Sequence, residues 1–369
     1  MKKIPKPIAF SLRFLPLAAL IGILFYLGSI NVASEVYIDL VSAQMSFDIA
    51  EHTDELIASV PLDSIQIFNC DLKLKLGKIL NNSAVISERG SLRITGTDQE
   101  AYSQISPTGK SHLLFKKLEV PAGAKIEISK GLNYLQIELS ASSGNQGKIR
   151  GELNTGGEFL FSGRNIQLDE NNILSDTDIL TISTHRFYKT LFFEANDPGI
   201  TLILHVSPDN MAEMEDIIKD MFVKNISFVT INQSRRRNRQ ESSIRSGQIQ
   251  IASADFFKKR FLLKQEELED SDFLDIADED QYFINFVKWE EKGFKISMFG
   301  EASTDLKKGR RVRLLRSISP SMLDFIMAEP SNKTLWAILV FILTQFATLR
   351  GIVKTQIEKY KSKKEEPTI

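Results

Sequence analysis

The chain contains a single cysteine, Cys70, among its 369 residues. One thiol excludes a disulfide within the chain, whereas large ectodomains of eukaryotic cells normally carry several. The four histidines, His52, His112, His185 and His205, also lack the spacing that is typical of a zinc site. We therefore expect a bacterial envelope protein that is stabilised by its apolar core and has no metal or other cofactor.

Motifs of catalysis and nucleotide binding are missing as well. H-E-x-x-H, G-x-S-x-G, C-x-x-C and G-x-G-x-x-G do not occur. Gly109-Lys110-Ser111 resembles the end of a phosphate-binding loop, but Gln104 replaces the glycine that such a loop requires. One further segment groups the residue types of hydrolase triads: Asp176, Asp178, Ser183 and His185. Because such triads assemble only in space, a tethered hydrolase stays an alternative, but no spacing favours an enzyme.

Opposite charges nearly balance over the whole chain. Lys and Arg number 46 against 47 Asp and Glu, which gives a formal net charge of −1. A chain without excess positive charge has no overall attraction for polyanions. We therefore expect no nucleic-acid partner.

Two long uncharged apolar stretches are present, and they lie near the two ends of the chain. The first runs from Phe14 to Ala33, and the second runs from Leu335 to Leu349 and continues past Arg350 to Val353. About 20 apolar helical residues cross a bilayer. The stretches therefore predict transmembrane helices over 14–33 and 335–353. The alternatives are a cleaved secretory signal for the first stretch and a buried core helix for the second.

Positive charge flanks each stretch on the side away from the middle of the chain. These flanking residues are Lys2, Lys3, Lys6 and Arg13 before the first stretch, and Arg350, Lys354, Lys359, Lys361, Lys363 and Lys364 in or after the second. Positive flanks favour the cytoplasm. We expect a protein of the bacterial cytoplasmic (inner) membrane, with both termini cytoplasmic and the bulk of the chain periplasmic.

Apolar and polar residues alternate with period two through much of the region between the stretches. The alternation is clear over Phe68–Leu76, which places Cys70 on the inward face, over Leu135–Leu139 and over Phe294–Met298. Turn-forming residues separate such runs, as at Pro121-Ala122-Gly123. This pattern predicts a mainly β fold: an antiparallel, sandwich- or jelly-roll-like extracytoplasmic region with one or two short helices, flanked by the two transmembrane helices.

Two segments carry helical signals. Ser207-Pro208 resembles a helix start, and a stripe from Met211 to Phe222 has helical spacing, which predicts a helix over about 208–223 that faces the core. Ser319-Pro320 begins a second amphipathic segment. The predicted segments are a cytoplasmic N-terminus (1–13), a first span (14–33), β-units over 34–170 and 171–318, a juxtamembrane helix (319–330), a second span (335–353) and a basic cytoplasmic tail (354–369).

Charged residues gather in three clusters. The first, in a segment poor in apolar residues, reads as an exposed basic loop and contains Arg235, Arg236, Arg237 and Arg239. A strongly acidic run extends from Glu266 to Asp280. A second basic cluster precedes the second span and contains Lys307, Lys308, Arg310, Arg311, Arg313 and Arg316. The last cluster is a candidate contact for lipid headgroups or for an acidic partner. Alternatively, the oppositely charged runs meet at a subunit interface, or each is solvated separately.

These features favour a non-enzymatic protein. Two spans would hold both ends of an extracytoplasmic β domain that serves as an interaction or assembly module of an envelope complex. Its expected partners are the membrane and other envelope or membrane proteins, with self-association into a homo-oligomer as a further interpretation. The alternative from another class is a glycan- or lipid-binding envelope protein that uses a groove, and a membrane-tethered hydrolase ranks third.

Overall fold

The structure is a computed structural model of the full chain. It describes residues 22, 24–32, 34–57, 59–76, 78–81, 84–87, 90–98, 100–140, 148–168, 172–174, 179–183, 190–195, 199–207, 210, 216–234, 237–253, 262–277, 280–302, 306–328 and 340. The chain divides into two compact units. The terminal unit comprises Met1–Val32, Asp255–Lys264 and Pro320–Ile369, and the β-unit comprises Ala33–Ala254 and Gln265–Ser319.

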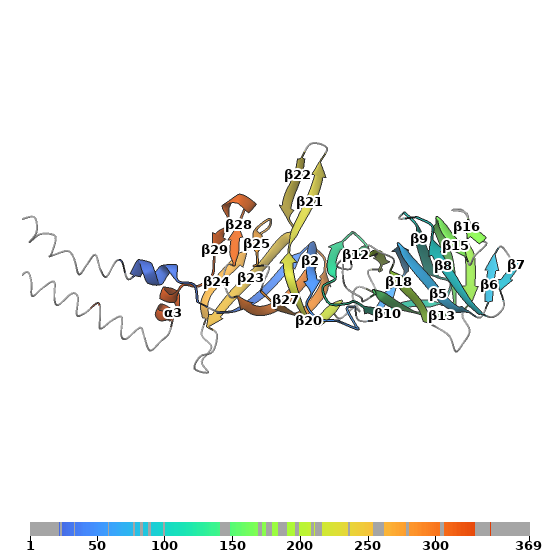
Figure 1. The fold of residues 1–369 in the computed structure, drawn as a ribbon, viewed down its shortest axis with the longest axis horizontal. Coiled ribbons are helices and arrows are strands. Elements are labelled where there is room, and N and C mark those ends of the chain that lie inside the picture. The colour runs from blue at the N-terminus through green and yellow to red at the C-terminus, as the bar shows by residue number, and fades with distance from the viewer. Residues whose placement is uncertain are drawn as a thin grey trace, which may run out of the picture. The chain divides into compact units, whose positions relative to one another are not determined.

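The β-unit consists of antiparallel sheets, as the alternation predicted (Figure 1). The large sheet has sixteen strands, in the spatial order β24 (Leu262–Leu268), β23 (Ile244–Ser253), β1 (Ser34–Ser42), β27 (Gly293–Ala302), β26 (Tyr282–Glu290), β20 (Ile218–Ser227), β2 (Gln44–Ile49), β11 (Lys125–Lys130), β12 (Tyr134–Ser140), β19 (Gly199–His205), β4 (Ser64–Phe68), β9 (Tyr102–Pro107), β14 (Glu158–Arg164), β17 (Leu180–Ser183), β6 (Lys78–Asn81) and β7 (Ala84–Ser87).

Three smaller sheets complete the strands that the structure describes. The small sheet has eight strands, in the order β16 (Asn172–Leu174), β15 (Ile166–Leu168), β8 (Gly90–Gly96), β5 (Cys70–Leu76), β18 (Thr190–Ala195), β13 (Arg150–Gly156), β10 (His112–Glu119) and β3 (Val60–Leu62). β21 (Val229–Ser234) and β22 (Arg237–Ser242) form a hairpin. β25 (Phe273–Asp275), β28 (Lys307–Gly309) and β29 (Arg316–Ser317) form a third sheet, next to a 3-10 turn over Val312–Leu314.

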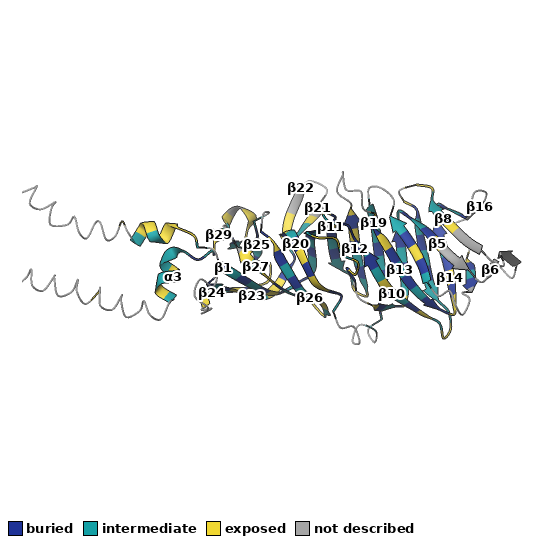
Figure 2. Cartoon of the chain, turned by 60° about the horizontal axis from the view of Figure 1, so that its bottom comes forward, coloured by how far each residue is buried: buried dark blue, intermediate teal, exposed yellow. Residues whose placement is uncertain are grey.

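Strands in the middle of the large sheet, such as β1, β12 and β19, bury alternate side chains, as Figure 2 shows by the alternation of dark blue with teal and yellow. In β12, Leu135, Ile137 and Leu139 are buried, whereas the residues between them are not. One continuous cluster of buried apolar residues includes side chains from both the large and the small sheet. The architecture is therefore mainly β and consistent with a β-sandwich, in which an apolar core lies between sheet faces.

The strand expected over Phe68–Leu76 is interrupted at its second residue. Asn69 adopts a positive φ of 54°, and its side-chain amide donates to the carbonyl of Gly199 at 2.6 Å. Asparagine tolerates this left-handed conformation better than most residues. The chain thereby passes from β4 in the large sheet to β5 in the small sheet. Cys70 is buried, as predicted, and burial, with a smaller contribution from Asp71, raises the pKa of its thiol.

Strand pairing joins segments that are distant in sequence. β1 at the start of the β-unit pairs with β27 near its end, and β13 pairs with β18. Strands before residue 170 therefore pair with strands after it, although the sequence suggested a boundary between two β-units at that residue. The compact β-unit includes strands from both sides of that residue.

The helix predicted over about 208–223 is wrong in its second half. Residues 208–209 and 211–215 lie outside the described residues, and β20 begins at Ile218. Within β20, Met221 and Val223 are buried and Phe222 between them is exposed, which is the period of a strand. β20 pairs with β2 on one side and β26 on the other. Pairing on both edges provides backbone hydrogen bonds and burial that override the helical spacing.

The terminal unit contains the helix that was predicted after Ser319-Pro320. This helix, α3, covers Met322–Ala328, and Ser321 caps it: the Asp324 amide donates to the Ser321 hydroxyl at 3.2 Å. The Ser321 amide in turn donates to the Asp324 carboxylate at 2.9 Å, which completes a reciprocal cap. An isolated β-bridge joins Asn31 to Ser321.

Most of the predicted spans, 14–33 and 335–353, lie outside the described residues. Of the first span, residues 22 and 24–32 are described, and of the second only Val340. Among the residues that are described, no helix combines the length and apolarity needed to cross a bilayer.

The hydroxyl of Tyr282 gives a test of the core. Tyr282 is fully buried, and its hydroxyl has no hydrogen-bond partner among the described residues. Burial, with a smaller contribution from Asp280, also raises the pKa of this phenol. An unsatisfied buried hydroxyl costs about 1–3 kcal/mol, so Tyr282→Phe should raise the free energy of unfolding by about 1 kcal/mol in denaturant titrations.

Tyr37→Phe is the matched control. The Tyr37 hydroxyl donates to the Glu35 carboxylate at 2.9 Å, so its removal should lower the free energy of unfolding by about 1 kcal/mol. Equal destabilisation by the two substitutions would show that the Tyr282 hydroxyl is satisfied in solution.

Candidate functional site

The acidic run and the second basic cluster meet within one chain. Arg316 contacts Glu266 at 3.0 Å, Arg310 forms an ion pair with Glu269, and Arg245, which lies outside the cluster, contacts Asp270 at 3.1 Å. The prediction that these runs are solvated separately is therefore wrong. Their contacts lie on the third sheet and the segments beside it, because β28 pairs with both β25 and β29.

Lys308 is a largely enclosed cation of this cluster. Its side chain is 14% exposed, and its ammonium lies 3.5 Å from Asp272 and 3.8 Å from Glu266. The Asp272 side chain is 5% exposed and also accepts a hydrogen bond from the Glu269 amide at 2.9 Å. A cation held in this way is engaged by carboxylates of its own chain and is poorly placed to attract an outside partner.

Of the other predicted basic residues, Lys307 is partly buried in β28. Arg311 is exposed and has no ion pair with the described residues, whereas the side chain of Arg313 lies outside them. Arg235 and Arg236 also lie outside the described residues. Arg237 and Arg239 belong to strand β22, so the loop expected there is wrong at these positions. The polar sequence of this segment does not predict a strand, and the pairing of β22 with β21 provides its backbone hydrogen bonds.

The face of the large sheet opposite its core carries polar side chains in rows, and we call it the outer face. Strand register sets one row across six strands: Ser46, Glu127, Glu138, Thr201, Phe68 and Tyr102. A neighbouring row is Gln44, Ser129, Gln136, Ile203, Gln66 and Gln104. Sequence alternation identified the polar face of each strand, but the rows require knowledge of which strands pair.

The outer face is hollowed over these rows. Two adjoining hollows of about 610 Å³ and 650 Å³ share four lining residues: Lys125, Glu127, Gln136 and Glu138. The base of the β21–β22 hairpin forms one wall of the second hollow and is held by a hydrogen bond of 2.8 Å from Thr230 to Gln44. In Figure 1 the hairpin stands out from the neighbouring strands. We call the two hollows together the polar groove.

Two carboxylates face one another in the floor of the groove. Glu127 on β11 lies directly opposite Glu138 on β12. The Gln44 amide donates to Glu127, and the Gln136 amide donates to Glu138 at 2.7 Å. Like charges directly opposite on neighbouring strands are destabilising, so further hydrogen-bond donors at this position would be favourable. The groove is thus suited to a ligand that offers several donors.

A ladder of aromatic side chains crosses four other strands of the outer face. Register places Tyr37, Phe299, Phe283 and Phe222 in one row over β1, β27, β26 and β20. Successive ring centroids are separated by 6.1, 5.3 and 4.9 Å. Phe222 and Phe299 are 44% and 40% exposed. An exposed aromatic row of this kind is typical of a contact surface.

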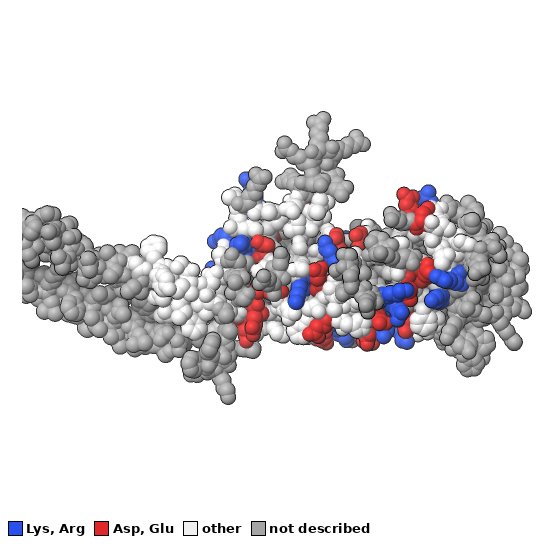
Figure 3. All heavy atoms as spheres, in the orientation of Figure 1, with Lys and Arg blue, Asp and Glu red and all other residues white. Residues whose placement is uncertain are grey.

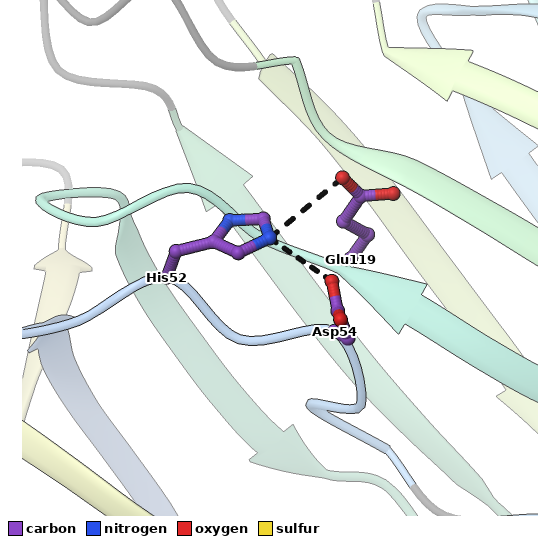
Figure 4. A group of neighbouring side chains, drawn as sticks. All are labelled: His52, Asp54 and Glu119. Carbon is purple, nitrogen blue, oxygen red and sulfur yellow. Dashed lines mark hydrogen bonds and ion pairs between the residues drawn. The ribbon is translucent and has the colours of Figure 1, made fainter.

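The structure also assembles a group that the sequence did not suggest. His52 lies 3.0 Å from Asp54 and 3.8 Å from Glu119, measured from its Nε2 atom to the nearest carboxylate oxygens (Figure 4). These three residues could hold a metal ion. Histidine spacing gave no signal, because Glu119 is distant in sequence and a strand pairing brings it near. The expectation that no metal site is present rested on spacing alone.

Other candidates from the sequence have ordinary surroundings or lie outside the described residues. The Ser111 hydroxyl accepts a hydrogen bond from the Glu158 amide at 2.9 Å, so it belongs to a turn contact between strands. His205 lies on the outer face and packs on the Tyr134 ring at 6.0 Å. Asp176, Asp178 and His185 lie outside the described residues.

Charge is mixed over the β-unit as a whole. In Figure 3, blue and red side chains intermingle on the face that is drawn. The small sheet shows this mixing in its ion pairs, such as Arg93 with Asp71 at 2.7 Å and Lys116 with Glu152 at 3.1 Å. Such a surface does not select ligands of one charge, which leaves the shaped polar groove and the aromatic ladder as the features with chemical selectivity. Comparison with known proteins finds no matching family model, no similar curated protein and no similar solved structure.

The enclosure of Lys308 predicts a large effect of its removal. Lys308→Met keeps most of the stem but leaves the enclosed Asp272 carboxylate without its cation, whereas Glu266 keeps its contact with Arg316. Breaking an enclosed pair in this way should cost about 3 kcal/mol of unfolding free energy in denaturant titrations. Arg311→Met, at an exposed site, should change it by less than about 0.5 kcal/mol.

A second substitution tests whether the unpaired carboxylate, rather than lost packing, causes the loss of stability in Lys308→Met. Adding Asp272→Asn to Lys308→Met removes the uncompensated carboxylate and keeps an oxygen that can accept from the Glu269 amide. The double variant should therefore be more stable than Lys308→Met alone. A double variant that is less stable than either single one would contradict the pairing.

Proposed function

We propose that the chain is a two-span protein of the bacterial inner membrane whose β-unit lies in the periplasm and binds a glycan in the polar groove. Binding rather than chemistry is the proposed role. The proposal combines two predictions from the sequence: the two-span membrane topology and the alternative function of a glycan-binding groove. One observation carries the choice of ligand: two adjacent rows rich in amides, hydroxyls and carboxylates, one of which ends at the aromatic rings of Phe68 and Tyr102.

Contacts within the terminal unit support the topology. The bridge between Asn31 and Ser321 joins the end of the first apolar stretch to the cap of α3, and the Val32 amide donates to the Pro320 carbonyl at 3.0 Å. Both predicted spans would then leave the membrane on the same side. Large apolar side chains are exposed within the first predicted span, as at Phe25, and shortly before the second, as at Met327. Such side chains are better placed in a lipid environment than in water.

The chemistry of the groove suits a ligand rich in hydroxyl groups. Carboxylates accept hydrogen bonds, and amides both donate and accept, so Glu127, Glu138 and Gln136 can each engage a sugar hydroxyl. At the end of the row, Phe68 packs on Tyr102 with a centroid distance of 5.3 Å. Aromatic rings provide an apolar surface for the C–H faces of sugar rings. The opposed glutamates disfavour a strongly anionic glycan.

The aromatic ladder supports a second candidate function, the interaction module that the sequence favoured first. Its outer-face neighbours along the same strands include the acidic residues Glu35, Asp39 and Glu301. Aromatic faces bordered by carboxylates suit a partner that presents Arg or Lys beside apolar residues. In this case the ladder, and not the groove, would hold an envelope or membrane protein.

Substitutions in the groove test the first function. Gln136→Ala combined with Glu138→Ala removes two of its polar contacts, and each is worth about 0.5–1.5 kcal/mol, so affinity should fall about ten-fold or more. The measurement is binding of the detergent-extracted full chain to a panel of immobilised envelope oligosaccharides. Glu152→Ala, on the small sheet, is the control and should bind as the unaltered chain does.

Substitutions in the ladder test the second function. Phe222→Ala combined with Phe299→Ala removes the two most exposed rings and should abolish copurification of a partner from native membranes while leaving oligosaccharide binding intact. Full oligosaccharide binding by the groove variant would overturn the glycan proposal. Loss of binding in the Glu152→Ala control would also overturn it, because the site would then not be the groove.

A further inference from the structure

We infer that His52, Asp54 and Glu119 form a binding site for a divalent transition-metal ion of the zinc class. The site lies in the β-unit and is separate from the residues that line the polar groove. It does not depend on the proposed function. The inference rests on the backbone that presents the three side chains, on their separations and on their chemistry.

A short strand pairing fixes the three side chains on one side. Thr53 and Val120 form an isolated antiparallel bridge, with amide-to-carbonyl distances of 3.1 and 2.9 Å in the two directions. In extended backbone, residues on either side of a paired residue point the opposite way from it. His52 and Asp54 therefore share a face, and Glu119, next to Val120, joins them. Figure 4 shows the three side chains converging from these two segments.

A second hydrogen bond keeps the two segments together. The Leu56 amide donates to the Leu118 carbonyl at 2.9 Å, and both of these apolar side chains are fully buried. The ligands are thus attached to backbone that is anchored in the core, although the His52 side chain itself is 53% exposed. Anchored ligands lose less entropy when they bind an ion than ligands on a free loop.

The separations suit a small metal ion. His52 Nε2 lies 3.0 Å from the Asp54 oxygen and 3.8 Å from the Glu119 oxygen. Ligands at about 2.0–2.1 Å from a tetrahedral zinc ion are about 3.4 Å apart. The two separations from His52 lie on either side of this value, and the Asp54 and Glu119 oxygens lie within 4.8 Å of each other.

The donor set selects the class of metal. Imidazole nitrogens and carboxylate oxygens are both ligands of zinc and related ions, whereas calcium and magnesium prefer oxygen donors alone. Three protein ligands leave at least one coordination position for water or an outside ligand. The site is therefore of the open type.

Among the described residues, no lysine or arginine forms an ion pair with Glu119, whose carboxylate contacts His52. Arg150 lies opposite Glu119 in the strand pairing, but its guanidinium contacts Glu194 at 3.4 Å. Glu119 also lines a cleft of about 330 Å³ on the small sheet, together with Lys73 and Lys117. Any anion that enters this cleft would find the metal ligand Glu119 in its wall.

Calorimetric titration of the untagged full chain in detergent with Zn²⁺ tests the inference. We expect one saturable site per chain and little heat with Mg²⁺ or Ca²⁺. Loss of even an outer-shell partner typically costs about 10–100-fold in metal affinity, so His52→Ala and Glu119→Gln should each weaken binding by about ten-fold or more.

His112→Ala is the matched control, because His112 is an exposed histidine at the opposite end of β10 from Glu119. It should leave the affinity unchanged. Thermal unfolding without metal verifies that all variants remain folded. Unchanged Zn²⁺ affinity in His52→Ala, or no saturable binding in the unaltered chain, would overturn the site and leave an ordinary surface contact between His52 and Asp54.

Discussion

The structure depends above all on the register of the large sheet. Successive side chains of a strand point to opposite faces, so a shift of one residue would exchange the buried and exposed sets. Burial of residues such as Phe47 and Phe161, both fully enclosed, holds each strand in its register. Where one strand carries an extra residue, as β20 does between Lys224 and Ser227 opposite β2, the pairing shifts locally and the apolar residues beyond it still face the core. The outer face is therefore as well defined as the core.

The polar groove and the aromatic ladder both follow from this constraint. Glu127 and Glu138 face one another because β11 and β12 pair as a hairpin with one fixed register. Tyr37 and Phe299 come from the first strand of the β-unit and from one near its end, yet register makes them neighbours. The metal ligands arise in the same way from a single bridge. Each proposed site is thus formed by residues of different paired segments, so the residues of one strand alone would not reveal it.

The sequence predicts the part of the fold that depends on local alternation. It identified the mainly β class, the inward face of β12 and of Cys70, and the short helix that became α3. It failed where pairing decides. Met221 and Phe222 have helical spacing with their neighbours but belong to β20, which two partner strands stabilise. Lys308 and Asp272 belong to runs that looked like separate solvated loops, because nothing local indicates that a third sheet brings them together.

The most direct test of the account is labelling of single cysteines with a membrane-impermeant maleimide in spheroplasts. The only native thiol, Cys70, is buried and should stay silent. The account predicts rapid labelling of Glu138→Cys on the outer face, none of Ile137→Cys in the core, and labelling of Ser362→Cys only after permeabilisation. Labelling of Ile137→Cys as fast as Glu138→Cys would contradict the sheet. Labelling of Glu138→Cys only after permeabilisation would contradict the periplasmic placement of the β-unit.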